Sequence, residues 1–443
     1  MKKKVRFLVL AAAMLLVLTG CGLKSPDELY QLPRPTPQYE SLQGSLDALL
    51  KSGYEYAAPL SGSNTQSVQL QDLDGDGVDE AVAFFRESGA KEHPLKICIF
   101  RGDAENGYEL AGQIESDGDA INSVVYCQLN DTPTMELVVG WRISGTVYAL
   151  SAYSLENGNV TQLMSTASYT RYAVTDLDQD NQAEIVSIQM GNVEDGGNVA
   201  TYYDWSEGTM MEVNSVPLSV SVEALDSVNY GYLTGGYPAL YVNGFRRENH
   251  IYLICDVLAL RDGTLTNITM DPVVGDSDTS RLVQTDIRDI NNDMATEIPI
   301  PRPLTSGNNA MDWVQYDLDG NQISTCYTIH NTADGWYFVL PDEWVKKLSV
   351  TREESNTGAT VERSMTFCYL DSETGEEVPF LSFYKNTGDN RDSRAVLGNR
   401  FLLEEDVEAT YAAEILTDEA YSGLTKEEVQ ERFRLIMNDW SNN

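Results

Sequence analysis

A nine-residue acidic window recurs along this chain and restricts its possible folds more than any other feature. The window reads Asp-x-Asp-x-Asp-Gly-x-x-Glu at residues 72–80, and related windows start at residues 128, 176, 232 and 289. Turn glycines follow these starts by 35, 30, 32, 31 and 31 residues, at Gly107, Gly158, Gly208, Gly263 and Gly320. Two markers in one register indicate a repeated module. Each module reads as strand, acidic loop, strand, strand, hairpin and strand.

These modules predict an all-β fold, a β-propeller of four-stranded blades spanning residues 41–420. We expect a sixth module over Trp336–Tyr384. Strand-like residues 396–416 are expected to join Tyr54–Tyr56 in a seventh blade, which would remove the open sheet edges. Six blades with an appendage is the alternative. The motif Asp-Leu-Asp-Gly-Asn at 317–321 falls at the hairpin position, so we interpret it as a turn.

Helices are expected only near the two ends of the chain. Residues 41–52 predict a short N-terminal helix. Residues 421–443 predict an amphipathic C-terminal helix that begins with a capping box of Thr425 and Glu428. Its apolar face, at helical spacing, would be Val429, Phe433, Ile436 and Trp440. This helix would pack against the propeller or bind a partner.

The acidic windows have the composition of a calcium-binding loop. Carboxylates at alternate positions of a tight loop can converge on one cation, and the seventh carbonyl and ninth carboxylate can complete a set of oxygen ligands. An EF-hand would need its glutamate at position twelve, where the first loop has Ala83. An Asp- and Asn-rich turn that binds no metal remains the alternative for each loop.

Over residues 66–330 this rhythm resembles the FG-GAP/VCBS repeats of integrin alpha-type propellers and bacterial surface proteins. The resemblance implies structural Ca²⁺ sites. The ligands in the first loop would be Asp72, Asp74, Asp76, the Val78 carbonyl and Glu80; in the second Asp176, Asp178, Asp180, the Gln182 carbonyl and Glu184; in the third Asp289, Asn291, Asp293, the Ala295 carbonyl and Glu297.

Three of the windows depart from the repeat pattern. The third loop has Met294 at position six, where a left-handed backbone favours glycine or asparagine. The window at Gln128 has no carboxylate at positions one, three and five and has Pro133 at position six, and the window at Tyr232 lacks the ligands. We expect the last two to be empty and treat the third loop as doubtful.

The N-terminus has the pattern of an export signal. Basic residues precede an apolar run from Phe7 to Leu18, and Leu-Thr-Gly-Cys at 18–21 resembles the lipobox of bacterial lipoproteins. The resemblance implies a signal peptide over 1–20, lipidation of Cys21, a proline-rich tether over 21–40, and attachment to the extracytoplasmic face of the cell membrane. A plain signal peptide is the alternative.

Charge and residue usage restrict the function. A formal net charge of −38 disfavours nucleic acid as a partner. Only three histidines occur, and no catalytic motif stands outside the acidic loops. These features favour a calcium-stabilised surface module that binds or scaffolds a protein or glycan. A propeller-based polysaccharide hydrolase or lyase and a subunit of an envelope assembly are the alternatives. The widely spaced cysteines predict free thiols: Cys98, Cys127, Cys255, Cys326 and Cys368.

Overall fold

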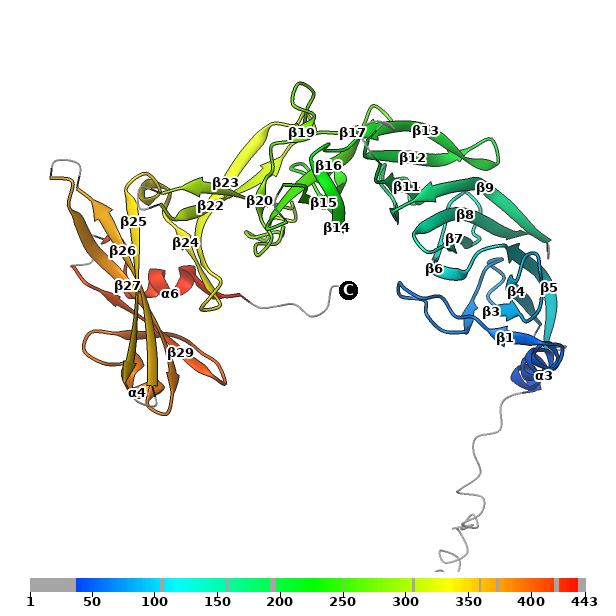
Figure 1. The fold of residues 1–443 in the computed structure, drawn as a ribbon, viewed down its shortest axis with the longest axis horizontal. Coiled ribbons are helices and arrows are strands. Elements are labelled where there is room, and N and C mark those ends of the chain that lie inside the picture. The colour runs from blue at the N-terminus through cyan, green and yellow to red at the C-terminus, as the bar shows by residue number, and fades with distance from the viewer. Residues whose placement is uncertain are drawn as a thin grey trace, which may run out of the picture. The chain divides into compact units, whose positions relative to one another are not determined.

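In a computed structural model of the chain, the described residues are 37–103, 107–156, 159–191, 197–248, 250–304, 307–357, 360–371, 374–417 and 422–436. Over these residues the fold is all-β, as predicted, with antiparallel sheets of four or five strands and few helices (Figure 1). The chain divides into two compact units, residues 1–121 with 155–161 and residues 122–154 with 162–443.

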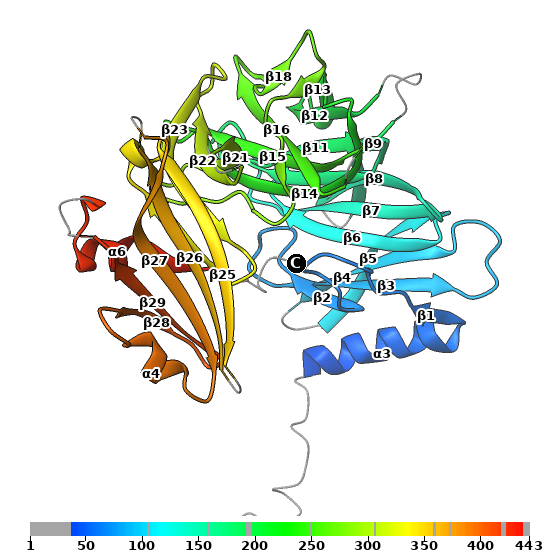
Figure 2. The same cartoon turned by 60° about the vertical axis from the view of Figure 1, so that its left-hand side comes forward.

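The first sheet has the order β1-β3-β4-β5, and β2 also pairs with β3. Helix α3 (Pro37–Lys51) covers one face of this sheet (Figure 2), where Leu42 and Leu46 pack against Ala81 and Phe85. The predicted N-terminal helix is therefore confirmed, and it begins inside the segment predicted as tether, because proline is tolerated at the first helical position. The strands are β1 (Tyr54–Tyr56), β2 (Val68–Gln71), β3 (Glu80–Glu87), β4 (Leu95–Asp103) and β5 (Gly107–Ser116).

Three further sheets follow in chain order. The second is β6-β7-β8-β9, with β6 (Ala120–Cys127), β7 (Glu136–Ser144), β8 (Val147–Glu156) and β9 (Asn159–Tyr169). The third is β10-β11-β12-β13, with β10 (Arg171–Thr175), β11 (Glu184–Gln189), β12 (Val199–Ser206) and β13 (Thr209–Pro217). The fourth is β14-β15-β16-β17 with β20 beside β16, comprising β14 (Val222–Tyr232), β15 (Pro238–Arg246), β16 (Tyr252–Arg261), β17 (Thr264–Asn267) and β20 (Arg281–Leu282).

The last two large sheets have five strands each. The fifth is β21-β22-β23-β24-β30, with β21 (Ile298–Pro303), β22 (Asn309–Tyr316), β23 (Gln322–Asn331), β24 (Trp336–Leu340) and β30 (Phe433–Leu435). The sixth is β25-β26-β27-β29-β28, with β25 (Leu348–Thr357), β26 (Thr360–Leu370), β27 (Glu377–Gly388), β28 (Phe401–Glu405) and β29 (Ala409–Ile415). The remaining elements are the hairpin β18 (Met270–Asp271) and β19 (Asp276–Ser277) and the helices η2 (Asp342–Trp344), α4 (Arg391–Ala395) and α6 (Lys426–Arg432).

Within the larger unit each sheet packs on the next through a core of its own. Leu150 and Ile185 belong to the core between the second and third sheets, and Ile188 and Leu258 to the next. Cys255 and Val257 of β16 share the next core with Ile298 of β21, and Trp336 with Phe383 belongs to the last one. The five cysteines are free, as predicted.

Four of the predicted hairpins lie at the predicted turn glycines, and the fifth glycine, Gly158, lies outside the described residues. Asp262 and Gly263 have φ of 53° and 73° between β16 and β17, the backbone that a tight two-residue hairpin requires. Gly107, Gly208 and Gly320 also have positive φ. The acidic motif at 317–321 forms the β22–β23 turn, as interpreted from the register.

The expected sixth module over Trp336–Tyr384 is wrong in its first strand. Strand β24 pairs with β23, so it belongs to the fifth sheet. The cause is the short turn at 331–335, in which Asn331 Nδ2 donates to Asp334 Oδ2 at 2.8 Å and Gly335 has φ of 78°. This turn folds β24 back beside β23 before a new sheet can begin.

The predicted seventh blade is also wrong in its composition. Residues of β28 and β29 extend the sixth sheet through the pairing of β29 with β27. Tyr54–Tyr56 pairs with β3 in the first sheet, where Tyr56 stacks on Phe85 with ring centroids 5.0 Å apart. The described residues therefore form six sheets of four or five strands.

The C-terminal helix is shorter than predicted. Its capping box at Thr425 and Glu428 is confirmed, but α6 ends at Arg432 and Phe433 is extended. Strand β30 then pairs with the edge of β24, which satisfies backbone groups that would otherwise be unpaired. Phe433 is buried against Trp336 and Phe383. Its spacing of four residues from Val429 therefore reflects burial as a strand residue and not a shared face of one helix. Trp440 lies outside the described residues.

Candidate metal-binding loops

A buried glutamate anchors each acidic loop at its ninth position. The four side chains are at most 1 % exposed: Glu80, Glu136, Glu184 and Glu297. In each loop the glutamate Oε2 accepts a hydrogen bond from the backbone N–H of the second loop residue, at 2.9, 2.7, 2.6 and 3.0 Å respectively. One oxygen of every ninth carboxylate therefore closes its loop, and only Oε1 is left for a cation.

In the first loop, carboxylate oxygens of Asp72, Asp74 and Glu80 lie within 4.8 Å of one another, so the group could hold a metal ion. Glu80 Oε1 is buried and has no hydrogen-bond partner among the described residues. Asp76, a predicted ligand, lies outside this group. An arginine lies beside the cluster, because Arg101 Nη2 is 3.1 Å from Asp74 Oδ2 and 3.6 Å from Asp76 Oδ2.

The second loop brings together its complete predicted carboxylate set. Oxygens of Asp176, Asp178, Asp180 and Glu184 lie within 4.8 Å of one another. Burial, together with the charges of the neighbouring aspartates, raises the pKa of Glu184 to about 8, against the lowering effect of the hydrogen bond from the Leu177 N–H. Within the described part of the chain, no basic side chain forms an ion pair with this cluster. Four carboxylates without a counter-charge make it the strongest candidate cation site.

The third loop also brings carboxylates together, but hydrogen bonds from within the protein already satisfy their oxygens. Oxygens of Asp289, Asp293 and Glu297 lie within 4.8 Å of one another. However, Gln315 Nε2 donates to Asp293 at 2.9 and 2.7 Å and to Glu297 Oε1 at 3.0 Å. Burial alone would raise the pKa of Asp293, but hydrogen bonds from Gln315 and Asn291 hold it below its usual value. An amide therefore lies against the oxygens that a cation would use.

In the window at Gln128, neutral side chains donate hydrogen bonds to the buried glutamate oxygen that a cation would otherwise contact. Glu136 Oε1 accepts hydrogen bonds from Asn130 Nδ2 at 2.9 Å and Thr134 Oγ1 at 2.7 Å. Pro133 is not among the residues with positive φ, as its ring requires. Together with the Leu129 N–H on Oε2, these donors satisfy both oxygens of Glu136 within the protein.

The window at Tyr232 is not a nine-residue copy, which corrects the alignment drawn from sequence. Tyr232 pairs with Pro238, so five residues separate the paired positions. In the first loop Gln71 pairs with Glu80, and eight residues separate them. The shorter loop explains why the expected ligands are missing from this window.

Two positions of each acidic loop adopt left-handed backbone, whereas the sequence pattern indicated one. At position six, Gly77, Asn181 and Met294 have φ of 86°, 73° and 76°. Position four is also left-handed, at Gly75, Gln179 and Asn292 with φ of 73°, 67° and 62°. These turns direct backbone N–H groups inward: Asp176, for example, accepts from Gln179 N at 2.6 Å and Asn181 N at 3.0 Å. Met294 thus takes the required conformation at a steric cost.

The carbonyl ligands expected at position seven remain predictions. Here the structure places backbone N–H groups on the fifth-position carboxylates, with Val78 N to Asp76 Oδ1 at 2.8 Å and Gln182 N to Asp180 Oδ1 at 2.7 Å. Ala295 N makes the same contact with Asp293 Oδ1 at 2.9 Å. These bonds hold the fifth side chain toward its own loop.

Sequence reasoning missed the residues that face the loops from a neighbouring strand. Arg101, Asp204 and Gln315 follow the ninth glutamates by 21, 20 and 18 residues, without any shared motif. Because the intervening turns differ in length, counting along the sequence could not align them. Only the pairing of strands shows that they hold one structural position.

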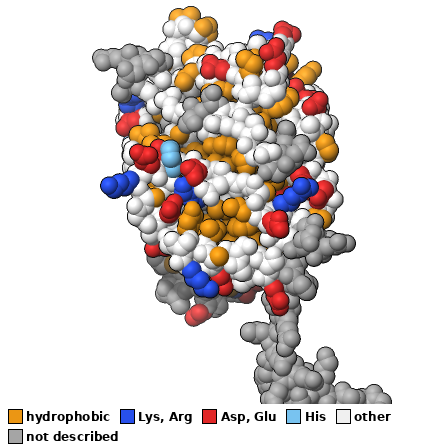
Figure 3. Space-filling view, turned by 90° about the vertical axis from the view of Figure 1, so that its right-hand side faces the viewer, with side chains coloured by type: hydrophobic (Ala, Val, Ile, Leu, Met, Phe, Trp, Pro, Cys, Tyr) orange, Lys and Arg blue, Asp and Glu red, His pale blue; other side chains and the backbone are white. Residues whose placement is uncertain are grey.

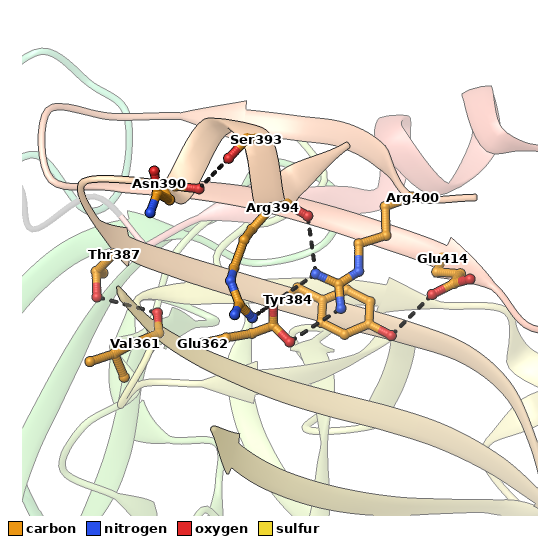
Figure 4. A network of polar contacts seen from close by, with 9 residues as sticks. All are labelled: Val361, Glu362, Tyr384, Thr387, Asn390, Ser393, Arg394, Arg400 and Glu414. Atoms are coloured by element: carbon orange, nitrogen blue, oxygen red, sulfur yellow. Dashed lines mark hydrogen bonds and ion pairs between the residues drawn. The ribbon is translucent and has the colours of Figure 1, made fainter. Parts of the chain in front are cut away.

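A second polar cluster, on the sixth sheet, is structural. Glu362 accepts hydrogen bonds from Arg400 at 2.7 and 3.2 Å and from Arg394 at 3.3 Å (Figure 4). The Arg400 guanidinium lies 3.5 Å from the centroid of the Tyr384 ring, and the Tyr384 hydroxyl donates to Glu414 at 3.2 Å. These hydrogen bonds hold the pKa of Glu362 below its usual value.

Two of the cavities lined by described residues lie in the larger unit, and neither of these two has the carboxylate pair that glycosidic chemistry uses. One, of about 380 Å³, is lined by Met190, Gly191, Asn198, Val222, Glu223 and Arg247. The other, of about 180 Å³, is lined by Val361, Arg363, Lys385 and Thr387.

Comparisons with known proteins do not identify a family. No protein family and no curated protein matches the sequence. Among solved structures, a GDP-Man-dependent mannosyltransferase from Leishmania mexicana is 10% identical, with a TM-score of 0.23 over 58% of this chain and 86% of that one. A post-proline cleaving enzyme from Rickettsia typhi is 9% identical, with a TM-score of 0.28 over 87% of this chain and 56% of that one. Similarity at this level carries no functional argument.

The predicted lipidation residue Cys21, the signal peptide and most of the tether lie outside the described residues. Among the helices that the structure describes, none has the length and apolar character needed to span a membrane.

Proposed function

We propose that this chain is a calcium-stabilised β-propeller that serves as a binding or scaffold module, tethered by a lipid at Cys21 to the extracytoplasmic face of the cell membrane. The observation that carries the proposal is the recurring loop with a buried ninth glutamate. In two loops the structure leaves carboxylate oxygens converging without enough donors to satisfy them. A cation bound only by the folded protein would stabilise it.

Calcium fits the donors better than other common metals. Every clustered side chain is a carboxylate, a hard oxygen ligand, whereas zinc favours histidine and thiolate. Calcium accepts six to eight oxygen ligands in flexible geometry, and magnesium demands a near-ideal octahedron with several waters. An irregular loop with carboxylates at positions one, three, five and nine suits the larger ion.

The propeller proposal rests on consecutive antiparallel sheets of four or five strands, which within the larger unit pack on their neighbours in sequence. Six such sheets favour six blades rather than seven. A closed propeller has a compact outline, with a radius of gyration of about 21 Å for 400 residues. Small-angle X-ray scattering in calcium tests this, and a radius well above that value would contradict closure.

A binding role is favoured over catalysis by the state of the histidines. His330 is stacked on Tyr337 with ring centroids 5.0 Å apart, and burial followed by the charge of Arg288 lowers its pKa to about 4. His93 and His250 pair with the exposed carboxylates of Asp117 and Glu223. On the face drawn in Figure 3, hydrophobic side chains are exposed between acidic and basic ones, a surface suited to a protein or glycan partner.

The calcium proposal is tested by thermal melting of the full chain in calcium, in magnesium and in EDTA. We expect a higher melting temperature in calcium, and a smaller calcium-dependent rise for the double variant Asp74→Ala, Asp178→Ala. Asp131→Ala removes an exposed acid from the window at Gln128, which is expected to be empty, and should behave as the parent does. Equal melting of the parent protein in calcium and in EDTA would contradict the proposal.

The anchor and the ligand need separate experiments. Radiolabelled palmitate should enter the parent protein but not Cys21→Ser, and the variant should leave the membrane fraction. Purified Cys21→Ser protein can then be screened against glycan arrays and envelope extracts with and without calcium. Release of reducing sugar from a bound glycan would favour the hydrolase alternative over simple binding.

A further inference from the structure

One strand position faces each acidic loop from the side. In the first sheet β3 pairs with β4 through Ala81 and Phe100, so the next pair in register is Glu80 with Arg101. The pairs Ile185–Tyr203 and Ile298–Val314 likewise place Asp204 opposite Glu184 and Gln315 opposite Glu297. The same step in the second sheet places Ser154 opposite Glu136. We call this residue the facing residue of its loop.

The facing residues of the first and third loops already occupy the ligand oxygens. Arg101 brings a positive charge to 3.1 Å from Asp74 Oδ2. Gln315 uses its amide hydrogens on both Asp293 oxygens and on Glu297 Oε1. Arginine is a partial substitute for a cation, because its side chain is 48% exposed and can move away. Glutamine is a closer substitute, since it reaches the buried oxygen itself.

The facing residue of the second loop has the opposite character. Asp204 adds a fifth carboxylate, which the strand register places opposite Glu184 as Arg101 is placed opposite Glu80. Its Oδ1 accepts from the Trp205 N–H at 2.6 Å, which holds the side chain at the strand. No described donor reaches Glu184 Oε1, so the facing residue adds charge without satisfying the loop.

An independent sign of a missing ligand comes from the first loop. Glu80 is 0% exposed, and its Oε1 has no partner in the described part of the chain although Arg101 is nearby. A buried carboxylate oxygen without a donor is costly, and proteins rarely leave one unsatisfied. The arginine therefore neutralises the outer aspartates but leaves the inner oxygen available to a cation.

We propose that the facing residue determines the cation occupancy of each loop. Asp204 makes the second loop the tight Ca²⁺ site, Arg101 makes the first loop a weaker site at which the cation must displace a guanidinium, and Gln315 makes the third loop independent of metal. This inference rests on the proposed calcium binding. It places the second loop, which has Asn181 at position six, ahead of the first loop, which matches the full Asp-x-Asp-x-Asp-Gly-x-x-Glu pattern.

The test is a titration of the full chain with Ca²⁺ by isothermal calorimetry, with Tb³⁺ luminescence as a second readout. We expect the parent to show one tight and one weaker class of site. Arg101→Gln should tighten the weaker class about tenfold, and Asp204→Asn should weaken the tight class about tenfold, as expected for one charge near a divalent ion in high dielectric. Arg352→Gln and Asp262→Asn remove the same charges at exposed sites distant in sequence from the loops and should change neither class.

Gln315→Glu is the complementary test, because it should create a Ca²⁺ site in the third loop. It replaces the amide by a carboxylate of the same shape, and we expect one additional Ca²⁺ bound per chain. If this variant folds only in calcium, its calcium-dependent melting reports the new site instead. A third Ca²⁺ bound by the parent protein would overturn the assignment of Gln315.

The outcomes separate this inference from the proposal on which it depends. A parent protein that binds no Ca²⁺ would overturn both the proposed calcium binding and the role of the facing residues. A parent that binds Ca²⁺ with affinities unchanged by Arg101→Gln and Asp204→Asn overturns the role of the facing residues alone. Changes equal to those of Arg352→Gln and Asp262→Asn would show a general charge effect and would also overturn it.

Discussion

Replacing Glu184 by glutamine is expected to stabilise the metal-free protein, although it removes a buried residue of the candidate site. Burial and the neighbouring aspartates raise the pKa of Glu184 to about 8, from an ordinary value of 4.5. The folded protein therefore retains a proton that the unfolded chain releases. Glutamine keeps the shape of the protonated acid and never ionises.

The sign follows from proton linkage. Because the folded pKa lies above the unfolded pKa, stability is fully present below about pH 4.5 and is lost as pH rises toward about 8. Each pH unit in this window costs about 1.4 kcal/mol, which amounts to about 3 kcal/mol at pH 7. Glu184→Gln should therefore gain about 3 kcal/mol over the parent at pH 7 without metal, and its stability should not fall over this window.

The protein contains both a precedent and a matched control for this substitution. In the third loop the Gln315 amide already donates to carboxylates of the acidic cluster. Glu136→Gln is the same change in the loop where Glu136 Oε1 accepts from Asn130 and Thr134. There an amide would face two donors, so we expect a loss of about 1–3 kcal/mol, the cost of unsatisfied buried groups.

The assay is urea-induced unfolding followed by tryptophan fluorescence from pH 5 to pH 8, in EDTA and in calcium. In calcium the parent should gain stability and Glu184→Gln should gain much less, because a charged ligand is missing. A loss of stability for Glu184→Gln in EDTA at pH 7, equal to that of Glu136→Gln, would refute the reasoning.

Three further predictions concern folding. Met294→Gly should raise the free energy of unfolding by about 1 kcal/mol in urea titrations, because Met294 has a φ of 76° and an exposed side chain. Arg400→Met should cost about 3 kcal/mol by leaving Glu362 without its main partner, and the pH dependence tied to the lowered pKa of Glu362, a loss of stability as pH falls below about 4.5, should become weaker, because Arg394 still donates to Glu362. Phe433→Ala should cost about 3–5 kcal/mol, whereas a solvent-exposed helix residue would cost far less.

How much of the fold could be predicted depends on how far apart in the sequence the interacting residues lie. The repeat of acidic window and turn glycine predicted the antiparallel sheets and the hairpins, because these features need only neighbouring residues. The assignment of edge strands failed where pairing partners are distant: β24 with β30 joins Trp336 to Leu435. Val429 and Phe433 have helical spacing, but the chain leaves the helix after Arg432 because β30 pairs with the open edge of β24.

The sequence by itself determined the acidic loops, their spacing and the residues that line them, since each loop is a local structure of nine residues. Tertiary structure alone decided what each loop can bind. Strand pairing brings Arg101, Asp204 or Gln315 against carboxylates about twenty residues away, and their charges differ. Near-identical loops are therefore neutralised by a guanidinium, left as a bare acidic cluster, or satisfied by an amide. The physical reason is that a cation site depends on the total charge and the free donors around it, which no single loop contains.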